Sequence, residues 1–360
     1  MKTIEPDGER RVFSLFPVLL VSLLLLSLSA CAPKTPETSP ISLFTWFQKN
    51  QPQQLQLTFD TTILDRANRE SGWRDGSLSG TTAQGLVFDI PVQVALRGNT
   101  RRTLCDRPPL KIRVDSSIWV GGEQIHRGKL KMVSPCLWES EGEQLLHRER
   151  LAYEMYQQIT PYSFQTYSTE IEYIPTSSFA KGVSLPVFFL EPKQDLYARL
   201  EVEKVKDEVI RNVSGNDYGS FVLFQYFIGN TDWNLSNRHN LVLVKDIEKG
   251  RAIPIPYDFD QSGLVNAPYA KPYPTMPINQ VTDRMLQWRG KNKEPLLLAI
   301  QQFQQLKPSL LESLMDNADL DVAVKAEMKQ FLQTFFLDLS RLIPEEEWAE
   351  TPNVSNPLAS

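Results

Sequence analysis

The chain has 360 residues, of which 41% are hydrophobic and 22% charged, so its composition is that of a globular protein with one large or two small domains. The formal net charge is −5 at pH 7 and no long basic run is present, which argues against nucleic acid as a partner. The three histidines and three cysteines form no cluster with the spacing of a zinc site.

The first 30 residues have the pattern of an export signal. Basic residues near the N-terminus precede an apolar run from about residue 12 to residue 28, and small residues come directly before Cys31. This order is typical of a bacterial lipoprotein, so we predict a signal peptide over residues 1–30 and a lipid on Cys31. A membrane-spanning helix is the alternative, but the run is near the lower limit of about 17 residues for spanning.

Residues 31–42 are rich in Pro, Thr and Ser and are predicted to be a tether. The membrane is then the first expected partner, held through the N-terminal lipid anchor rather than through charge. Ala32, rather than Asp, follows the cysteine, which in a Gram-negative bacterium favours the periplasmic face of the outer membrane. The exported chain is expected to be lipid-anchored in the cell envelope.

Alternation of apolar and polar residues predicts a β-rich region that contains one helix, and 3.6-residue periodicity predicts a mainly helical region after it. The fold class is therefore predicted to be α+β. The expected strands are 55–59, 90–96, 110–114, 129–133, 170–173, 186–190, 241–244 and 253–257. The expected helices are 143–159, 217–228, 281–288, 294–306, 310–315 and 322–342.

Two cysteines besides Cys31 are available for a disulfide. Cys105 and Cys136 lie in the β-rich region, and a pair of cysteines in an exported protein favours a disulfide. Two unpaired, buried thiols are the alternative, since free cysteine behaves as a small apolar residue.

A polar loop and a predicted hairpin in the second half form the most informative stretch. The loop 229–240 contains Asp232 and several asparagines, and the hairpin that follows ends in Asp258 and Asp260. A hairpin would return these two carboxylates to the loop that holds Asp232. Such residues could also simply turn a loop or lie on the surface, since Asp and Asn favour turns.

Carboxylates with an amide oxygen suit magnesium, and a separate loop aspartate can hold and deprotonate a hydroxyl. Phosphoryl-transfer enzymes combine these groups with a strand lysine that holds phosphates and a helix glutamate that pairs with it. Lys111 on a predicted strand and Glu149 on a predicted helix match that order. Lys111 could equally be an ordinary lysine of an edge strand.

The chain resembles the spore coat protein H (CotH) family of atypical secreted kinases, and within it an exported bacterial lipoprotein branch. The resemblance covers about residues 50–345. The fold that it implies is bilobal and protein-kinase-like, with a β-rich N-lobe over 43–192, a mainly helical C-lobe over 193–345 and a flexible tail over 346–360. The resembling segments are 97–99, 108–111, the helix around Glu149, 188–191, 229–232, 239–240 and 257–269.

The resemblance also implies residue roles. Cofactors would be Mg²⁺ and ATP, with the ATP phosphates on Lys111, Glu149 paired with that lysine, and Glu191 at a hinge beside the adenine. Asp232 would be the catalytic acid group. The metal ligands would be Asp258, Asp260 and an asparagine. Asn240 is preferred because it stands at the strand start after His239, and Asn237, at the common kinase spacing, is the alternative. No clear Gly-rich loop precedes the lysine, and the segment 97–100 is its nearest substitute.

The expected function is an envelope lipoprotein that transfers phosphate from Mg-ATP to a hydroxyl of an envelope protein or another acceptor. The alternative is a catalytically inactive, kinase-like scaffold or binding lipoprotein for envelope assembly, of which a calcium site is a variant. A phosphatase of the haloacid-dehalogenase type is less favoured, because the roughly 100 residues after Asp260 look helical and lack the alternating strands of that fold.

Overall fold

The computed structural model describes residues 39–69, 72–98, 100–177, 181–205, 213, 215–246, 250–272 and 276–342. The predicted signal peptide, the predicted lipidation site Cys31 and the predicted tail 346–360 lie outside these ranges, as does most of the predicted tether. No helix within the described ranges is long and apolar enough to cross a membrane.

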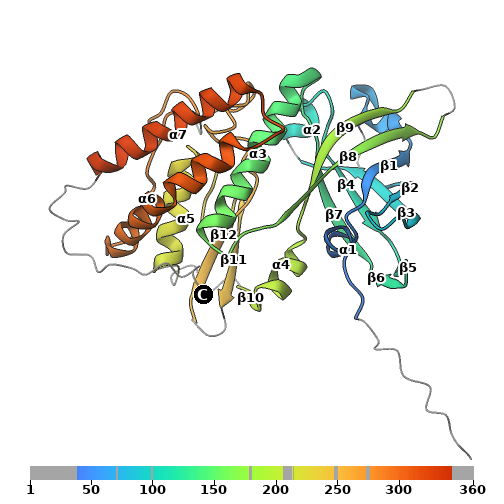
Figure 1. Ribbon diagram of the computed structural model, residues 1–360, viewed down its shortest axis with the longest axis horizontal. Coiled ribbons are helices and arrows are strands. Elements are labelled where there is room, and N and C mark those ends of the chain that lie inside the picture. The colour runs from blue at the N-terminus through green and yellow to red at the C-terminus, as the bar shows by residue number, and fades with distance from the viewer. Residues whose placement is uncertain are drawn as a thin grey trace, which may run out of the picture. The chain divides into compact units, whose positions relative to one another are not determined.

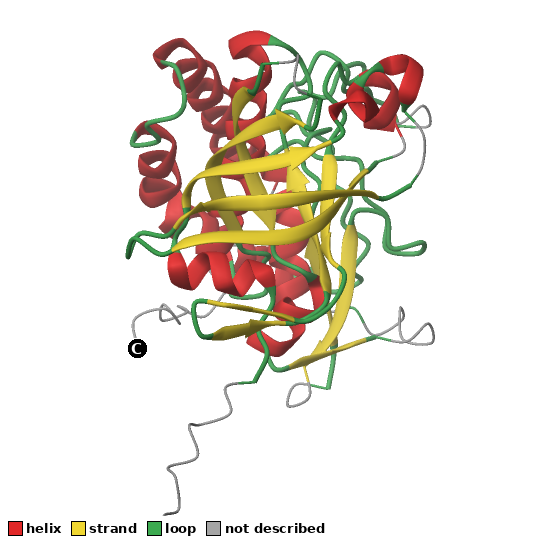
Figure 2. Ribbon diagram, turned by 90° about the vertical axis from the view of Figure 1, so that its right-hand side faces the viewer, coloured by secondary structure: helices red, strands yellow, loops and turns green. Residues whose placement is uncertain are grey.

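Seven strands close into a barrel in the order β1-β2-β3-β4-β7-β9-β8. Figure 2 shows strands in yellow with helices in red behind them. The pair β1–β8 is parallel and the other pairs are antiparallel. Alternate residues fill the interior: Leu110, Ile112 and Val114 of β4 are buried, whereas Lys111 and Arg113 lie on the outer face. The strands are β1 Gln53–Phe59, β2 Arg74–Thr81, β3 Val87–Leu96, β4 Leu110–Val114, β7 Gly128–Val133, β8 Thr166–Pro175 and β9 Val183–Leu190.

The helix α1, Leu43–Asn50, contributes to the core of the barrel although the sequence did not predict it. Ser42 caps it by accepting a hydrogen bond from the Thr45 amide, and Trp46 and Phe47 are fully buried in that core. The short elements beside the barrel are η1 Thr61–Leu64, η2 Arg66–Asn68, α2 Thr100–Leu104, β5 Ile118–Val120, β6 Glu123–Ile125 and α4 Lys193–Arg199.

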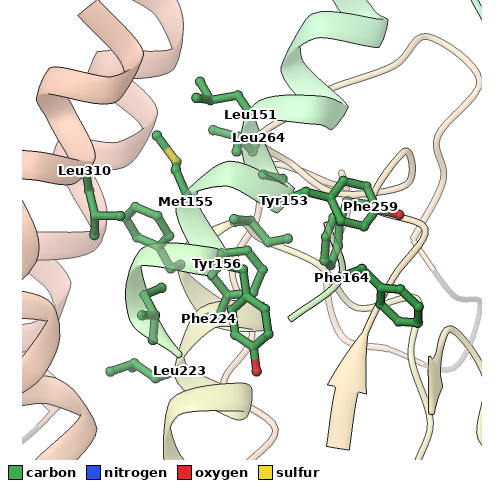
Figure 3. Close-up of a cluster of buried hydrophobic side chains, with 14 of the residues drawn as sticks. Leu151, Tyr153, Met155, Tyr156, Phe164, Leu223, Phe224, Phe259, Leu264 and Leu310 are labelled. Atoms are coloured by element: carbon green, nitrogen blue, oxygen red, sulfur yellow. The ribbon is translucent and has the colours of Figure 1, made fainter. Parts of the chain in front are cut away.

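A second core lies among four long helices, the short helix α4 and a three-stranded sheet of order β10-β11-β12 (Figure 1). The cluster is aromatic, and Tyr156 and Phe224 from two of these helices pack ring against ring at 4.5 Å (Figure 3). The elements are α3 Glu139–Ile159, α5 Asn216–Phe227, α6 Glu294–Met315, α7 Val322–Leu342, β10 Val202–Lys204, β11 Leu241–Asp246 and β12 Ala252–Pro256.

The predicted bilobal, protein-kinase-like fold is wrong. The described chain has a closed seven-stranded barrel of mixed strand direction, two further sheets and seven α-helices, instead of a β-rich lobe joined to a mainly helical one. Closure comes from parallel pairing of β1 with β8, where Leu55 lies opposite Ile171. Alternation predicted both strands, but pairing between such distant segments leaves no periodic signal in the sequence.

Three predicted helices also need correction. Residues 281–288 form turns and irregular backbone instead of a helix. Their apolar side chains do not form one helical face; the Trp288 ring, for example, stacks on Tyr218 with ring centroids 5.0 Å apart. The two helices predicted on either side of Pro308 are one continuous helix, α6. The breaking tendency of proline is overridden there because one face of α6 is buried in the second core.

Candidate functional site

The β11–β12 hairpin brings two polar segments together. Leu241 pairs with Pro256, and the Tyr257 amide donates a hydrogen bond to the Asn240 carbonyl over 3.0 Å. The residue that precedes β11 therefore lies beside the residues that follow β12. As the sequence predicted, Asp258 is returned to the loop that carries Asp232, and both residues line one cleft.

Two glycines hold the segment after Asp260 against the loop of Asp232. The Gly263 amide donates to the Gly229 carbonyl over 3.0 Å, and the Gly229 backbone has a φ of 63°. A β-carbon added at Gly263 would lie 2.5 Å from the Val281 carbonyl oxygen. Only a residue without a side chain permits this approach, so the glycines fix the distance between the two acidic segments.

The Asp232 carboxylate is held by the two residues that directly precede β11. His239 Nε2 lies 2.9 Å from Asp232 Oδ1, and Asn240 Nδ2 donates to Asp232 Oδ2 over 2.9 Å. Asn237 is exposed, accepts a hydrogen bond from the His239 amide, and is not among the residues that line the cleft. Of the two candidate metal-binding asparagines, Asn240 is the one inside the cleft.

Asp258 is positioned through its backbone. Its amide donates to the Tyr153 hydroxyl over 2.8 Å, and the Tyr153 ring packs on Phe259 at 4.6 Å (Figure 3). The backbone φ is 68° at Asp258 and 53° at Asn240. Residues that carry a side chain rarely adopt this left-handed conformation, and it recurs at functional sites. The Asp258 carboxylate makes no hydrogen bond or ion pair with another described residue, so it is available to a ligand.

One cleft of about 1070 Å³ collects these groups. Acidic side chains from the hairpin and its loop form one wall, and basic side chains from the barrel form another. The polar and charged lining residues are Arg97, Arg101, Lys111, Lys131, Thr231, Asp232, His239, Asn240, Tyr257, Asp258, Asp260, Gln261, Tyr269 and Lys271.

Glu149 pairs with Arg101, not with the predicted Lys111. Arg101 lies 3.4 Å from Glu149 and 3.6 Å from Asp260, so it bridges two carboxylates that are both almost fully buried. Burial raises the pKa of Glu149 to about 8, with Arg101 opposing the shift and Asp260 adding to it. Burial likewise raises the pKa of Asp260, which is engaged by Arg101 and is therefore a poor metal ligand.

Two lysines reach the cleft from the outer face of the barrel. Lys111 and Lys131 are opposite each other on β4 and β7, but their surroundings differ. The Lys111 ammonium lies 5.0 Å from the centre of the Trp73 ring, and the charges acting on it are cations. Burial lowers the pKa of Lys131 to about 8, and Asp258 opposes that shift. Of the two lysines, Lys131 is thus the one whose pKa is raised by a carboxylate of the acidic wall.

Glu191 lies away from the cleft. Arg199 donates to both of its carboxylate oxygens over 2.8 Å, and the Gln165 amide donates to one of them over 3.0 Å. The side chain is buried, and it is not one of the residues that line the cleft. A carboxylate satisfied in this way joins β9 to α4 and does not fit the hinge role implied by the resemblance.

The donor set fits magnesium only in part. Within the described ranges, no three His, Cys, Asp or Glu side chains are grouped so as to hold a metal ion. Magnesium bound with a phosphate ligand needs only one or two carboxylates and keeps several waters. The free Asp258 carboxylate and the Asn240 amide oxygen, which accepts no hydrogen bond from a described residue, provide that smaller set.

A disulfide links Cys105 to Cys136, with Cα atoms 4.6 Å apart. Cys105 directly follows α2, which carries Arg101, and Cys136 comes shortly before α3, which carries Glu149. The disulfide predicted from the sequence is therefore confirmed. The sequence did not show which buried charges it would bring together. The bond ties together the two segments whose buried charges meet beneath the cleft.

Comparison with known proteins gives no further assignment. No protein-family model matches the chain, and no curated protein matches it.

Proposed function

We propose that the cleft binds a magnesium–nucleoside triphosphate and transfers its terminal phosphoryl group to a hydroxyl. The observation that carries this proposal is the juxtaposition of charges: Lys131, Lys111 and Arg97 line the cleft together with Asp232, Asn240 and Asp258. A polyphosphate with its metal carries both signs of charge and is complementary to such a cleft. The resemblance to the CotH family supports the same chemistry through the motifs around Asp232 and Asp258.

The residues divide into three roles. Lys131, with Lys111 and Arg97, would hold the phosphate oxygens. Asp258 and the Asn240 oxygen would hold magnesium, which neutralises charge that develops on the phosphates. Asp232 would orient the accepting hydroxyl, since His239 and Asn240 fix its carboxylate by hydrogen bonds of 2.9 Å.

The reaction balances as a displacement at phosphorus. The acceptor oxygen forms a bond to the terminal phosphorus while the bond from that phosphorus to the bridging oxygen breaks, and the nucleoside diphosphate leaves. The proton of the acceptor hydroxyl passes to Asp232 and then to solvent. Arg101, Glu149 and Asp260 take no direct part and support the floor of the cleft.

We further propose that the protein is exported and anchored by lipid at Cys31. The signal-like N-terminus supports this location. The disulfide between Cys105 and Cys136 supports it as well, because such bonds persist mainly in oxidising compartments. A Cys31→Ser variant is expected to lose metabolic palmitate labelling, and labelling that survives the change would contradict the anchor.

Label transfer tests the activity. The purified protein is incubated with magnesium and ATP labelled in the terminal phosphate, and transfer to the protein itself and to general hydroxyl acceptors is measured. Asp258→Asn is expected to abolish transfer, whereas Asp89→Asn, an exposed aspartate of β3, is expected to behave like the parent protein. If the parent binds Mg-nucleotide without transferring phosphate, the non-catalytic binding function is the better account.

A further inference from the structure

Basic side chains on the outer face of the barrel form a block of paired charges. Lys111 lies opposite Lys131, and Arg113 lies opposite Lys129, on the antiparallel strands β4 and β7. Like charges placed directly opposite each other in a sheet are destabilising. The four cations occupy two successive outward-facing positions on each of the two strands. Their mutual repulsion therefore indicates a surface that binds an anionic ligand. We name Lys111, Arg113, Lys129 and Lys131 the basic strip.

Few carboxylates compensate the basic strip within the described part of the chain. Asp115, itself exposed, lies 3.4 Å from Arg113 and is shared with Arg127. Lys129 has no ion pair with a described residue, and it lies 5.9 Å from the Trp73 ring centre. Burial lowers the pKa of Lys111, and Lys129 and Arg113 lower it further. The strip thus concentrates positive charge on a chain whose net charge is −5.

The basic strip connects two cavities. Lys111 and Lys131 line the cleft described above. Arg113 and Lys129 line a second cavity of about 520 Å³, together with His126 and Asp195. The Asp195 carboxylate already accepts hydrogen bonds from the hydroxyls of Ser42 and Thr45. A ligand that follows the strip would enter the cleft at one end and the second cavity at the other.

We propose that the basic strip binds an extended acidic polypeptide segment. This segment would also present the accepting hydroxyl to the cleft, and that presentation alone rests on the proposed function. Side chains two apart on β4 repeat every 6.6 to 6.8 Å, roughly the same repeat as alternate side chains of an extended peptide. Acidic residues at every second position would therefore meet Lys111 and Arg113 in turn. A flat membrane surface would not follow a path between two hollows.

Single-stranded nucleic acid is the less suitable occupant. Such ligands are held by aromatic rings that are open for base stacking as well as by positive charge. Trp73 and Tyr257 are aromatic residues at the strip, and cations already lie over both rings. The Arg113 guanidinium is 4.3 Å from the centre of the Trp73 ring, and the Lys131 ammonium is 4.6 Å from the centre of the Tyr257 ring. The available interaction is charge alone, which suits a carboxylate-rich chain.

Binding of a fluorescent peptide in which Glu and Ser alternate tests the proposal, with the full-length protein, no nucleotide and low salt. We expect Lys129→Glu to weaken binding about tenfold and Arg113→Gln to weaken it less, because single exposed charges contribute modestly. Lys291→Glu makes the same change of charge at an exposed position that lines neither cavity, and its affinity is expected to match the parent protein. A peptide with Gln in place of Glu is expected not to bind.

Three results would overturn the proposal. The first is equal binding of the Gln peptide, and the second is an equal loss of peptide affinity in Lys129→Glu and Lys291→Glu. The third is tighter binding of anionic phospholipid vesicles or oligonucleotides than of the acidic peptide, with the same dependence on Lys129. The test is separate from that of phosphoryl transfer. Asp258→Asn is expected to keep peptide binding and lose label transfer, so failure of the reaction leaves the peptide result intact. Lys129→Glu is expected to keep nucleotide binding.

Discussion

The two walls of the cleft are built in opposite ways. The acidic wall comes from one stretch of chain, in which a hairpin returns Asp258 to the loop of Asp232. The basic wall comes from β4, β7 and the segment that follows β3, where sheet register places Lys111 beside Lys131. Local connectivity therefore determines one wall, and pairing between separate strands determines the other.

The walls also differ in how their charges are satisfied. On the acidic side, Asp232 is held by His239 and Asn240, Asp260 is paired with Arg101, and Asp258 alone is left without such a partner among the described residues. On the basic side, Lys111 and Lys131 face other cations across the sheet. The basic wall is the one that lacks counter-charge, which is why we expect the ligand to be predominantly anionic.

The largest effect is expected where the two walls meet, at Arg101. Arg101→Met would leave Glu149 and Asp260 buried without their shared cation, and breaking a buried pair costs about 3 to 5 kcal/mol of unfolding free energy. Urea denaturation measures the loss. The double variant with Glu149→Gln is expected to recover part of it, and an unchanged midpoint for Arg101→Met would show that the pairing does not matter.

Removing the disulfide that ties the segment of Arg101 to the segment of Glu149 is expected to have a similar but smaller effect. The disulfide spans a sequence separation of 31 residues, for which chain entropy gives about 3 to 4 kcal/mol. The variant with both Cys105 and Cys136 changed to Ala is compared with the parent protein by the same denaturation. A loss below about 1 kcal/mol would mean that the link contributes little beyond the non-covalent contacts.

Tyr153 tests the acidic wall on its own. Tyr153→Phe removes the hydroxyl that accepts the Asp258 amide hydrogen bond, and leaving that donor unsatisfied costs about 1 to 3 kcal/mol. Nucleotide affinity should fall as well, because the carboxylate loses its fixed position. Tyr167→Phe, which removes a hydroxyl bonded to the Pro52 carbonyl on the barrel, is the control: it should alter stability but not nucleotide affinity.

The smallest effect is expected from the protonation of Lys131. Its pKa of about 8 means that the ammonium loses its proton as the pH rises through that value, so nucleotide affinity should fall between about pH 7 and pH 9. Lys131→Arg keeps its charge over this range and is expected to flatten the profile. A parent profile that is as flat as that of the variant would exclude Lys131 from phosphate binding.

The sequence predicted the acidic wall because its information is local. Asp232, Asn240 and Asp258 flank one hairpin, and the two short apolar runs that form β11 and β12 are enough to bring them together. The sequence favoured Asn240 over Asn237 only by its position at the strand start. The structure distinguishes them directly, because Asn240 lines the cleft and donates to Asp232, whereas Asn237 is exposed and lies outside the cleft lining.

The basic wall could not be predicted in the same way. Lys131 lies in a strand that the sequence indicated, but only the pairing of β4 with β7 shows that it faces the cleft beside Lys111. Arg101 was missed because it lies on a short helix without periodicity, and its partners Glu149 and Asp260 are far away in the sequence. Barrel closure was missed for the same reason.

The central claim is that the two walls together bind a metal–polyphosphate through Asp258 and Lys131. Calorimetric titration with Mg-ATP, repeated with ATP in excess chelator, tests it most directly. We expect binding that requires magnesium, is lost in Asp258→Asn, is weakened about tenfold or more in Lys131→Ala, and is unchanged in Asp89→Asn. Binding that is equal with and without magnesium, or that survives Asp258→Asn undiminished, would contradict the account.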